Sequence, residues 1–127
     1  MEIIRSLSSI HKVKSSGTRV NYYLQKEYEI HYSEIPPETL QEWHFHNTIE
    51  ETILILCGRL EVRWVAENDI RKSTVGKGDL IRVENTPHTF VNQGNKSATF
   101  VVFKMMLEGK DNSEIFKKDK IYFDLPG

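Results

Sequence analysis

Residues 43–51 of the chain read WHFHNTIEE and, together with His88 further along, they decide how the sequence is interpreted. Alternate residues of a β-strand point to the same face, so His44 and His46 can bind one ion together. Histidine is the commonest side-chain ligand of transition metals near neutral pH. A carboxylate from Glu51 and a third imidazole from His88 would complete a site of nitrogen and oxygen ligands. The stretch therefore predicts a protein built around a metal ion.

The composition places the chain among ordinary globular proteins. It has 127 residues, of which 39% are apolar and 28% are charged. We expect a single domain over residues 1–127, with N-terminal strands in 1–35, a central core in 39–107 and a tail in 108–127. The formal net charge is −1, so the chain has no excess of basic residues of the kind found in proteins that bind nucleic acids or anionic membranes. We therefore expect no nucleic acid and no membrane as partners.

Cysteine usage and the N-terminal sequence both indicate the cytoplasm. Cys57 is the only cysteine, so the chain has no intrachain disulfide. The first residues, MEIIRSL, lack the cationic start and the long apolar run of a signal peptide. No run of about 18 apolar residues occurs, which excludes a transmembrane helix. A cytoplasmic protein is the expectation.

Turn residues divide the sequence into short segments that are rich in β-branched and aromatic residues, a composition typical of strands. Gly58-Arg59 has the composition of a two-residue hairpin turn, because glycine supplies the positive φ that such turns need. We expect an all-β sandwich or barrel with one short helix at 112–118. The expected strands are 20–23, 28–32, 52–57, 60–64, 71–75, 80–83, 89–92 and 98–106.

The spacing of His44, His46, Glu51 and Gly58 resembles the first motif of the cupin superfamily, in which HxH is followed by a glutamate and then a glycine. Residues 78–92, which read GDLIRVENTPHTFVN, are similar to the second motif of that family. Together the two motifs cover about half of the chain.

Three residues depart from the family pattern. Glu38 and Asn85 stand where the motifs have glycine, and Val83 stands where the second motif has proline. Asparagine is the non-glycine residue best able to adopt a left-handed conformation, so we expect the turn at Asn85 to survive. None of the departures removes a ligand.

The resemblance implies a double-stranded β-helix, the jelly-roll barrel of small cupins, with one divalent metal ion in its mouth. It places His44, His46, Glu51 and His88 on the ligand positions. Such a set suits Fe, Mn, Ni, Co, Cu or Zn, and it leaves about two positions of a six-coordinate ion for water or substrate. Glu50 also follows His46 closely and is an alternative carboxylate. The family spacing favours Glu51 and leaves Glu50 in solvent.

Strand parity assigns further residues to the interior. If Glu51 faces the metal, a period of two places Ile53, Ile55 and Cys57 on the same inner face. Phe90 and Asn92 share the face of His88 in the same way. These five residues are the expected walls of a substrate pocket, although core packing explains Phe90 equally well.

The resemblance implies a metal-dependent enzyme that acts on a small oxygen-bearing metabolite, as a dioxygenase or an isomerase does. Glu51 then either stays a ligand or acts as a general base. The alternative is a non-catalytic module that binds or senses a small molecule, with the metal as an anchor. We expect a homodimer, because a small barrel leaves sheet edges that invite pairing. The apolar tail, residues 121–127, is expected to dock on the barrel.

Overall fold

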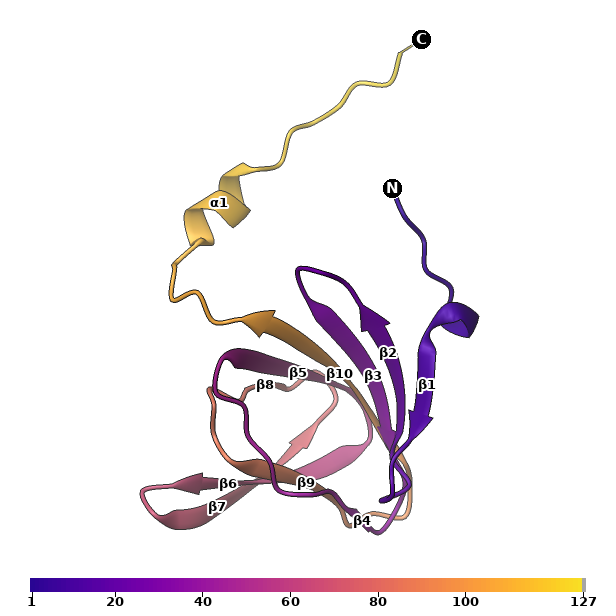
Figure 1. The fold of residues 1–127 in the computed structure, drawn as a ribbon, viewed down its shortest axis with the longest axis vertical. Helices are drawn as coiled ribbons and strands as arrows, with labels where there is room; N and C mark the ends of the chain where they lie inside the picture. Colours follow the sequence, from indigo (N-terminus) through magenta and orange to yellow (C-terminus); the bar gives the residue numbers. More distant parts are fainter. Residues whose placement is uncertain (127) are drawn as a thin grey trace.

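The computed structural model describes residues 1–126, and β-strands dominate it (Figure 1). Within these residues a 3-10 turn at Ser6–Ser8 precedes the first strand, and helix α1 spans Ser113–Lys118. The strands are β1 (Ile10–Val13), β2 (Arg19–Leu24), β3 (Glu29–Ile35), β4 (Thr39–Leu40), β5 (Ile49–Cys57), β6 (Arg59–Ala66), β7 (Asp69–Gly76), β8 (Leu80–Arg82), β9 (His88–Asn92) and β10 (Ala98–Met106).

The strands form two antiparallel sheets whose order differs from the order of the chain. The larger sheet runs β1-β2-β3-β10-β5-β8, and the smaller sheet runs β4-β9-β6-β7. From β3 onward the chain crosses between the sheets at every connection except the β6–β7 hairpin. This alternation is the jelly-roll arrangement, so the predicted fold class is confirmed.

Gly58 turns the chain from one sheet to the other. The prediction that Gly58-Arg59 forms a hairpin is wrong, because β5 lies in the larger sheet and β6 in the smaller one. Gly58 has φ +80°, and a Cβ there would lie 2.9 Å from the Cα of Ala98 and from the carbonyl oxygen of Ser97. A hairpin and a corner between sheets both need glycine at a positive φ, so the sequence signal for the two is the same.

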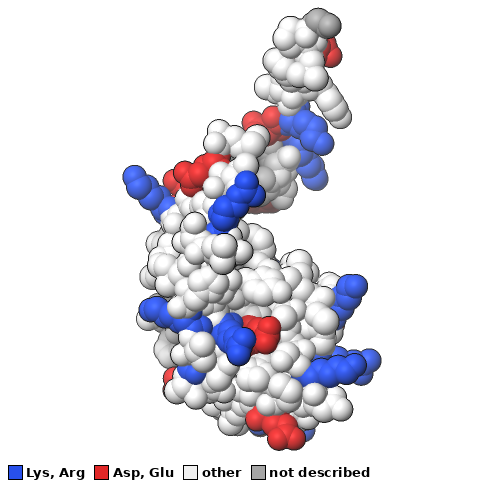
Figure 2. Space-filling view, turned by 90° about the vertical axis from the view of Figure 1, so that its right-hand side faces the viewer, with Lys and Arg blue, Asp and Glu red and all other residues white. Residues whose placement is uncertain are grey.

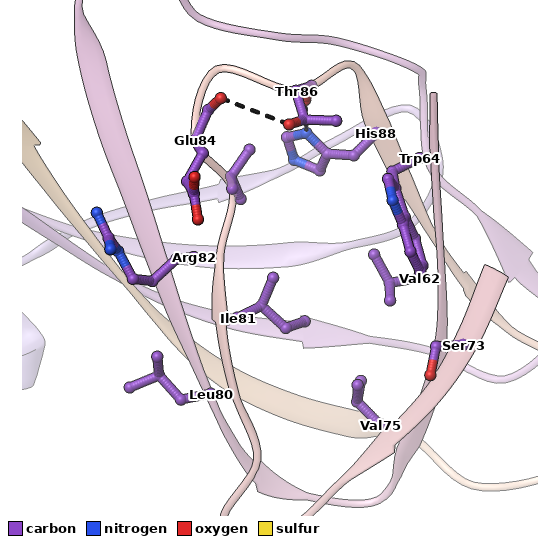
Figure 3. A pocket seen from close by; sticks show the side chains of 11 residues that line it. Val62, Trp64, Ser73, Val75, Leu80, Ile81, Arg82, Glu84, Thr86 and His88 are labelled. Carbon is purple, nitrogen blue, oxygen red and sulfur yellow. Dashed lines mark hydrogen bonds between the residues drawn. The ribbon is translucent and has the colours of Figure 1, made fainter. Parts of the chain in front are cut away.

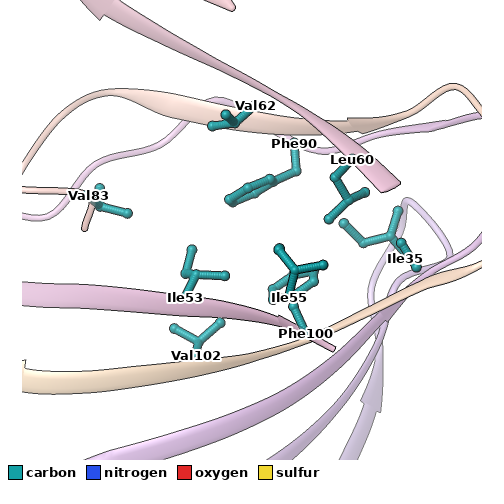
Figure 4. Close-up of a cluster of buried hydrophobic side chains, with 10 residues drawn as sticks. Ile35, Ile53, Ile55, Leu60, Val62, Val83, Phe90, Phe100 and Val102 are labelled. Carbon is teal, nitrogen blue, oxygen red and sulfur yellow. The ribbon is translucent and has the colours of Figure 1, made fainter. Parts of the chain in front are cut away.

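Inward side chains from both sheets meet in one apolar cluster (Figure 4). The rings of Phe90 on β9 and Phe100 on β10 stack across the interior with their centroids 5.5 Å apart. Burial of such side chains is the main force that holds the two sheets together. The buried members of the cluster are Ile35, Ile53, Ile55, Leu60, Val62, Val83, Phe90, Ala98, Phe100 and Val102.

The segment after β10 leaves the barrel, and Figure 1 shows it in yellow, extending away from both sheets. The prediction that residues 121–127 dock on the barrel is wrong for residues 121–126, whose large side chains stay exposed, and residue 127 lies outside the described residues. Six large apolar side chains of the segment are between 64% and 89% exposed: Ile115, Phe116, Ile121, Tyr122, Phe123 and Leu125.

Charges are mixed over the surface. On the face drawn in Figure 2, basic and acidic side chains are scattered among uncharged ones, as the net charge of −1 leads us to expect. None of the helices within residues 1–126 is long and apolar enough to cross a membrane.

Candidate metal centre

His44 and His88 lie directly opposite each other on two neighbouring backbone segments. The two residues exchange both backbone hydrogen bonds, in which the N–H of each donates to the carbonyl of the other at 3.1 and 3.0 Å. Residues paired in this way have their side chains on the same face. Their imidazole centroids are 4.4 Å apart. Backbone pairing therefore brings together two histidines that are far apart in the sequence.

His46 and Glu51 bring further donor atoms to the same place. The Nε2 atom of His46 lies 2.6 Å from Oε1 of Glu51, and the Nε2 atom of His44 lies 3.7 Å from the same oxygen. One ligand atom from each of these three residues lies within 4.8 Å of the other two. His88 stands beside His44, at the edge of this closest group.

Two buried atoms that could ligate a metal have no hydrogen-bond partner within residues 1–126. They are Oε1 of Glu51, whose side chain is 6% exposed, and Nε2 of His88, a residue that is 2% exposed. The short contact between Nε2 of His46 and Oε1 of Glu51 lacks hydrogen-bond geometry, so it does not satisfy the buried oxygen. Buried polar atoms normally have partners, and a divalent metal would supply one to each. The residues present therefore fit the metal that the fold implies.

The outer ring nitrogens of two histidines are held by backbone carbonyls. Nδ1 of His44 donates to the carbonyl of Glu42 at 3.1 Å, and Nδ1 of His88 donates to the carbonyl of Thr86 at 2.8 Å. Because a carbonyl only accepts, Nδ1 carries the proton and Nε2 of the neutral ring keeps its lone pair. Hydrogen bonds of this kind orient metal-bound histidines. Both rings are thus held in the tautomer that ligates through Nε2.

The electrostatics of Glu51 and His88 suit a cation, whereas the raised pKa of His44 favours its protonated form. Burial by itself would raise the pKa of Glu51, but the imidazole of His44 and the charge of Lys104 outweigh it and lower the pKa to about 2. Glu51 in turn raises the pKa of His44. Burial lowers the pKa of His88, so its ring is neutral near neutral pH. An ionised carboxylate and a neutral buried imidazole are the protonation states that bind a metal.

The loop between β8 and β9 leads to His88, and hydrogen bonds to β5 and to the residues just before it hold the loop in place. Glu84 and Asn85 are left-handed, with φ of +54° and +59°, which confirms the expectation for Asn85. The carboxylate of Glu50 accepts the N–H of Glu84 at 3.2 Å, and the amide of Asn85 donates to the carbonyl of Asn47 at 2.9 Å. Glu50 is 4% exposed, so the prediction that it lies in solvent is wrong: the loop folds over it.

An apolar hollow of about 480 Å³ reaches His88 from the side of β6, β7 and β8. Figure 3 shows the side chains of Val62, Trp64 and Ile81 around this hollow, with His88 at its upper end. Arg82 also lines it, so the wall is apolar with a charged margin.

A second hollow, of about 490 Å³, lies beside His44 and His46. Its walls are polar and include the side chains of Lys14, Gln41 and Lys104. The histidine cluster is therefore reached by an apolar space at His88 and by a polar space at His44 and His46.

Three of the five expected pocket residues belong to the hydrophobic core. Ile53, Ile55 and Phe90 are 1–2% exposed, pack within the apolar cluster and line neither hollow. Their predicted inward orientation is right, but their predicted role as pocket walls is wrong. Alternation along a strand shows which face a residue occupies, and it does not show how deep in the barrel that residue lies.

Cys57 is exposed, which contradicts its predicted inward orientation. The pairing between β5 and β10 shifts at this point, because Phe100 pairs with Ile55 whereas Thr99 pairs with Cys57. Leu56 is the extra residue of this β-bulge, and an inserted residue reverses the alternation of the strand beyond it. Cys57 therefore faces outward with Thr99.

Asn92 is 1% exposed and inward, and its side chain binds the backbone. Its amide nitrogen donates to the carbonyls of Ile35 at 3.0 Å and Lys96 at 2.8 Å, and its oxygen accepts the N–H of Gly94 at 3.0 Å. These bonds fix the turn between β9 and β10. Asn92 lines a hollow near the turns at Gly58 and Gly94, and it lines neither of the two hollows at the histidine cluster.

Two neighbours of the cluster have no signal in the motifs. Lys104 is the Cα partner of Glu51 in the pairing of β10 with β5, a register that the sequence alone does not specify. Trp64 pairs with His88 across β6 and β9. The regular alternation of Leu60, Val62 and Trp64 is the one pattern that marks Trp64 as inward-facing.

Comparison with known families agrees with this geometry. The cupin domain family matches residues 31–104, more than half of the chain, and the chain therefore belongs to the cupin family. The motif resemblance in the sequence is thereby confirmed. A comparison with curated proteins finds no match.

Solved structures share the fold at low sequence identity. A predicted oxalate decarboxylase from Thermotoga maritima is 19% identical, with a TM-score of 0.69 over 84% of this chain and 100% of that one. FeII HppE is 14% identical, with a TM-score of 0.68 over 83% of this chain and 60% of that one. Vicilin from hazelnut, Corylus avellana, is 20% identical, with a TM-score of 0.68 over 83% of this chain, which spans 32% of vicilin. At these identities the likenesses show the fold alone.

Proposed function

We propose that this cupin binds one divalent first-row transition metal through His44, His46, Glu51 and His88, and that it uses the metal to act on a small oxygen-bearing metabolite. The observation that carries the proposal is a pair of buried atoms that lack a hydrogen-bond partner among the described residues, Oε1 of Glu51 and Nε2 of His88, beside two further imidazoles. The nitrogen and oxygen ligands suit Fe, Mn, Co, Ni, Cu or Zn. When bound, such an ion acts as a Lewis acid that polarises a substrate oxygen.

Other groups of the chain orient the ligands and shape the space around them. The carbonyls of Glu42 and Thr86 orient the rings of His44 and His88. The pKa of Glu51 is lowered to about 2 by His44 and Lys104, which keeps its carboxylate ionised and favours its role as a ligand. The hollow at His88 gives one side of the cluster a largely apolar wall.

An enzymatic role is consistent with the names of two proteins that share the fold. One is named a predicted oxalate decarboxylase, and another is HppE in its FeII form. Dioxygenase and isomerase chemistry both use an ion with open positions, and both are consistent with this ligand set. A cytoplasmic location stays a prediction.

The proposed function is tested by loading the protein with each metal and screening small oxygen-bearing metabolites by thermal shift. Product formation and oxygen consumption are then measured for each metabolite that binds. We expect turnover that needs the metal and is absent from His88→Ala. Metal-dependent binding that leaves every metabolite chemically unchanged would refute the enzyme and identify a binding module.

We also propose that two copies of the chain form a homodimer through the tail. Phe116, Tyr122 and Phe123 are 79–89% exposed, and exposed apolar groups of this size mark association surfaces. The outer strands β1 and β8 of the larger sheet offer edges for pairing. Light scattering is expected to give a dimer mass for the full chain and a monomer mass after removal of residues 108–127. A monomer mass for the full chain would contradict the proposal.

A further inference from the structure

The polar hollow beside His44 and His46 is bounded by elements from distant parts of the chain. The turn between β1 and β2 contributes Lys14, and β10 contributes Lys104. Glu42 is the one carboxylate of the wall, and its side chain is exposed. The wall of this space therefore includes two lysines, one glutamate and the two histidines.

Lys104 is positioned by strand pairing. It is the Cα partner of Glu51 on one side and of Glu29 on the other, so the three side chains share the inner face of the larger sheet. The residue is half-buried. Within residues 1–126 its ammonium group forms no salt bridge, although two carboxylates lie in the same row of the sheet. The ammonium group of half-buried Lys104 is therefore free to bind an anion.

Lys14 is held at the rim by a turn that is itself anchored to the histidine segment. Its N–H donates to the carbonyl of Thr18 at 2.8 Å, and the N–H of Gly17 donates to the carbonyl of Lys14 at 2.9 Å. Thr18 is fully buried, and its hydroxyl accepts the side-chain amide of Gln41 at 3.3 Å. Gln41 begins the segment that leads to His44. The turn therefore keeps a fixed place beside the cluster.

We propose that this hollow is the subsite for the carboxylate of a small organic acid whose other oxygen atoms bind the metal. The inference rests on the proposed function, because it names the substrate class of the same site. The ammonium groups of Lys14 and Lys104 outnumber the carboxylate of Glu42, which leaves an excess of positive charge in the wall. Lysine binds carboxylates as a point charge, with three donors free to rotate.

The other hollow does not compete for the charged end of such an acid. Its charged members, Arg82 and Glu84, are one of each sign, and its remaining wall is mostly apolar. A volume of about 490 Å³ is within the range of small-molecule sites. The carboxylate of the substrate thus belongs on the side of His44 and His46, and any apolar part belongs on the side of His88.

The test compares 3,4-dihydroxybenzoate with its neutral analogue 3,4-dihydroxybenzamide. Both carry the same chelating pair of hydroxyl groups, and they differ in the carboxylate. Calorimetry on the zinc-loaded protein measures both affinities, because zinc has no redox chemistry that would consume the probes. The variant combines Lys14→Gln with Lys104→Gln, and the control is Lys77→Gln, an exposed lysine in the turn between β7 and β8. Zinc content and circular dichroism are recorded for every sample.

We expect the wild type and Lys77→Gln to bind the acid about tenfold more tightly than the amide, a difference of about 1.4 kcal/mol, and the double variant to lose most of this preference. If the double variant does not fold, Lys14→Gln alone changes an exposed residue and is expected to lose about threefold of the preference. Equal affinities in the wild type, or a preference that survives in the variants at full zinc content, would overturn the subsite. A wild type that binds no zinc would overturn the metal site and the subsite with it.

Discussion

The apolar core of the barrel, which we call its deep end, and its mouth, the level of Glu51, His88 and Lys104, are built on the same strands. The two regions differ in chemistry. On β5 the inward residues change from Ile53, which is 1% exposed and apolar, to the carboxylate of Glu51. On β9 they change from Phe90 in the core to the imidazole of His88. On both strands, therefore, a core residue and a candidate ligand are only two positions apart.

The same change occurs on β10, at the same level of the sheet. Val102 pairs with Ile53 in the core, and Lys104 pairs with Glu51 at the mouth. The core therefore fixes the geometry of the mouth, because each polar residue stands one pleat above a tightly packed apolar one. A ligand cluster on such a base needs little reorganisation to bind an ion.

The largest effect on stability is expected in the core. Phe90→Ala removes a buried ring that stacks on Phe100, and it should lower the free energy of unfolding by about 3–5 kcal/mol in urea titrations. The variant should still bind metal where it remains folded, since Phe90 holds no ligand atom. A loss below about 1 kcal/mol would show that the deep end is not the stabilising part of the barrel.

The next effect concerns Glu51 in the metal-free protein. Its pKa is lowered from 4.5 in the unfolded chain to about 2 in the folded protein. The ionised carboxylate therefore stabilises the fold at pH values above 4.5, and this contribution is lost as the pH falls from 4.5 toward 2. The contribution is on the order of 3 kcal/mol. Urea unfolding between pH 7 and pH 3 should show a smaller acid-induced loss for Glu51→Gln than for the wild type.

Glu114→Gln is the matched control for that titration, because Glu114 is a 70% exposed carboxylate on α1. It should follow the wild-type pH dependence. An acid-induced loss that is equal in the wild type and in Glu51→Gln would contradict the electrostatics assigned to the mouth.

A smaller effect is expected where the core meets the turn between β9 and β10. Asn92→Ala removes three hydrogen bonds to the backbone, and unfolding should become easier by about 1–3 kcal/mol. Asn95→Ala changes an exposed residue of the same turn and should stay within about 0.5 kcal/mol of the wild type. Equal losses in the two variants would refute the anchoring role of Asn92.

The smallest effect is expected at Cys57. Because the bulge in β5 turns this residue outward, Cys57→Ser should change stability by less than about 0.5 kcal/mol. The native thiol should also react with a maleimide without prior unfolding. Protection of the thiol in the folded protein would show that the alternation of β5 continues to its end.

Much of this molecule could be predicted from local patterns, and the limits of those patterns are physical. Alternation and turn residues located β5, β6 and β10, since a period of two is a property of the strand itself. The motif spacing selected Glu51 over Glu50, and the structure places Glu51 within reach of the imidazoles. Depth, bulges and register depend on distant partners, and so the roles of Ile53 and Cys57 were not predictable.

The candidate site shows the same limit. His44 and His88 were expected together because the family motifs link them, and their backbone pairing brings the rings side by side. Lys104 had no such link, because its place beside Glu51 follows from the register of β10 on β5. The candidate ligands were thus readable in the sequence, whereas the residues around them follow from the assembly of the sheets.

Metal content per chain tests the central claim most directly. Elemental analysis of the wild type, of His88→Ala and of His11→Ala compares one buried histidine of the mouth with one exposed histidine of β1. The account predicts about one equivalent of a divalent metal in the wild type and in His11→Ala, and a loss of most of it in His88→Ala while the barrel stays folded by circular dichroism. A metal-free wild type after expression in metal-rich medium, or an unchanged metal content in His88→Ala, would contradict the account.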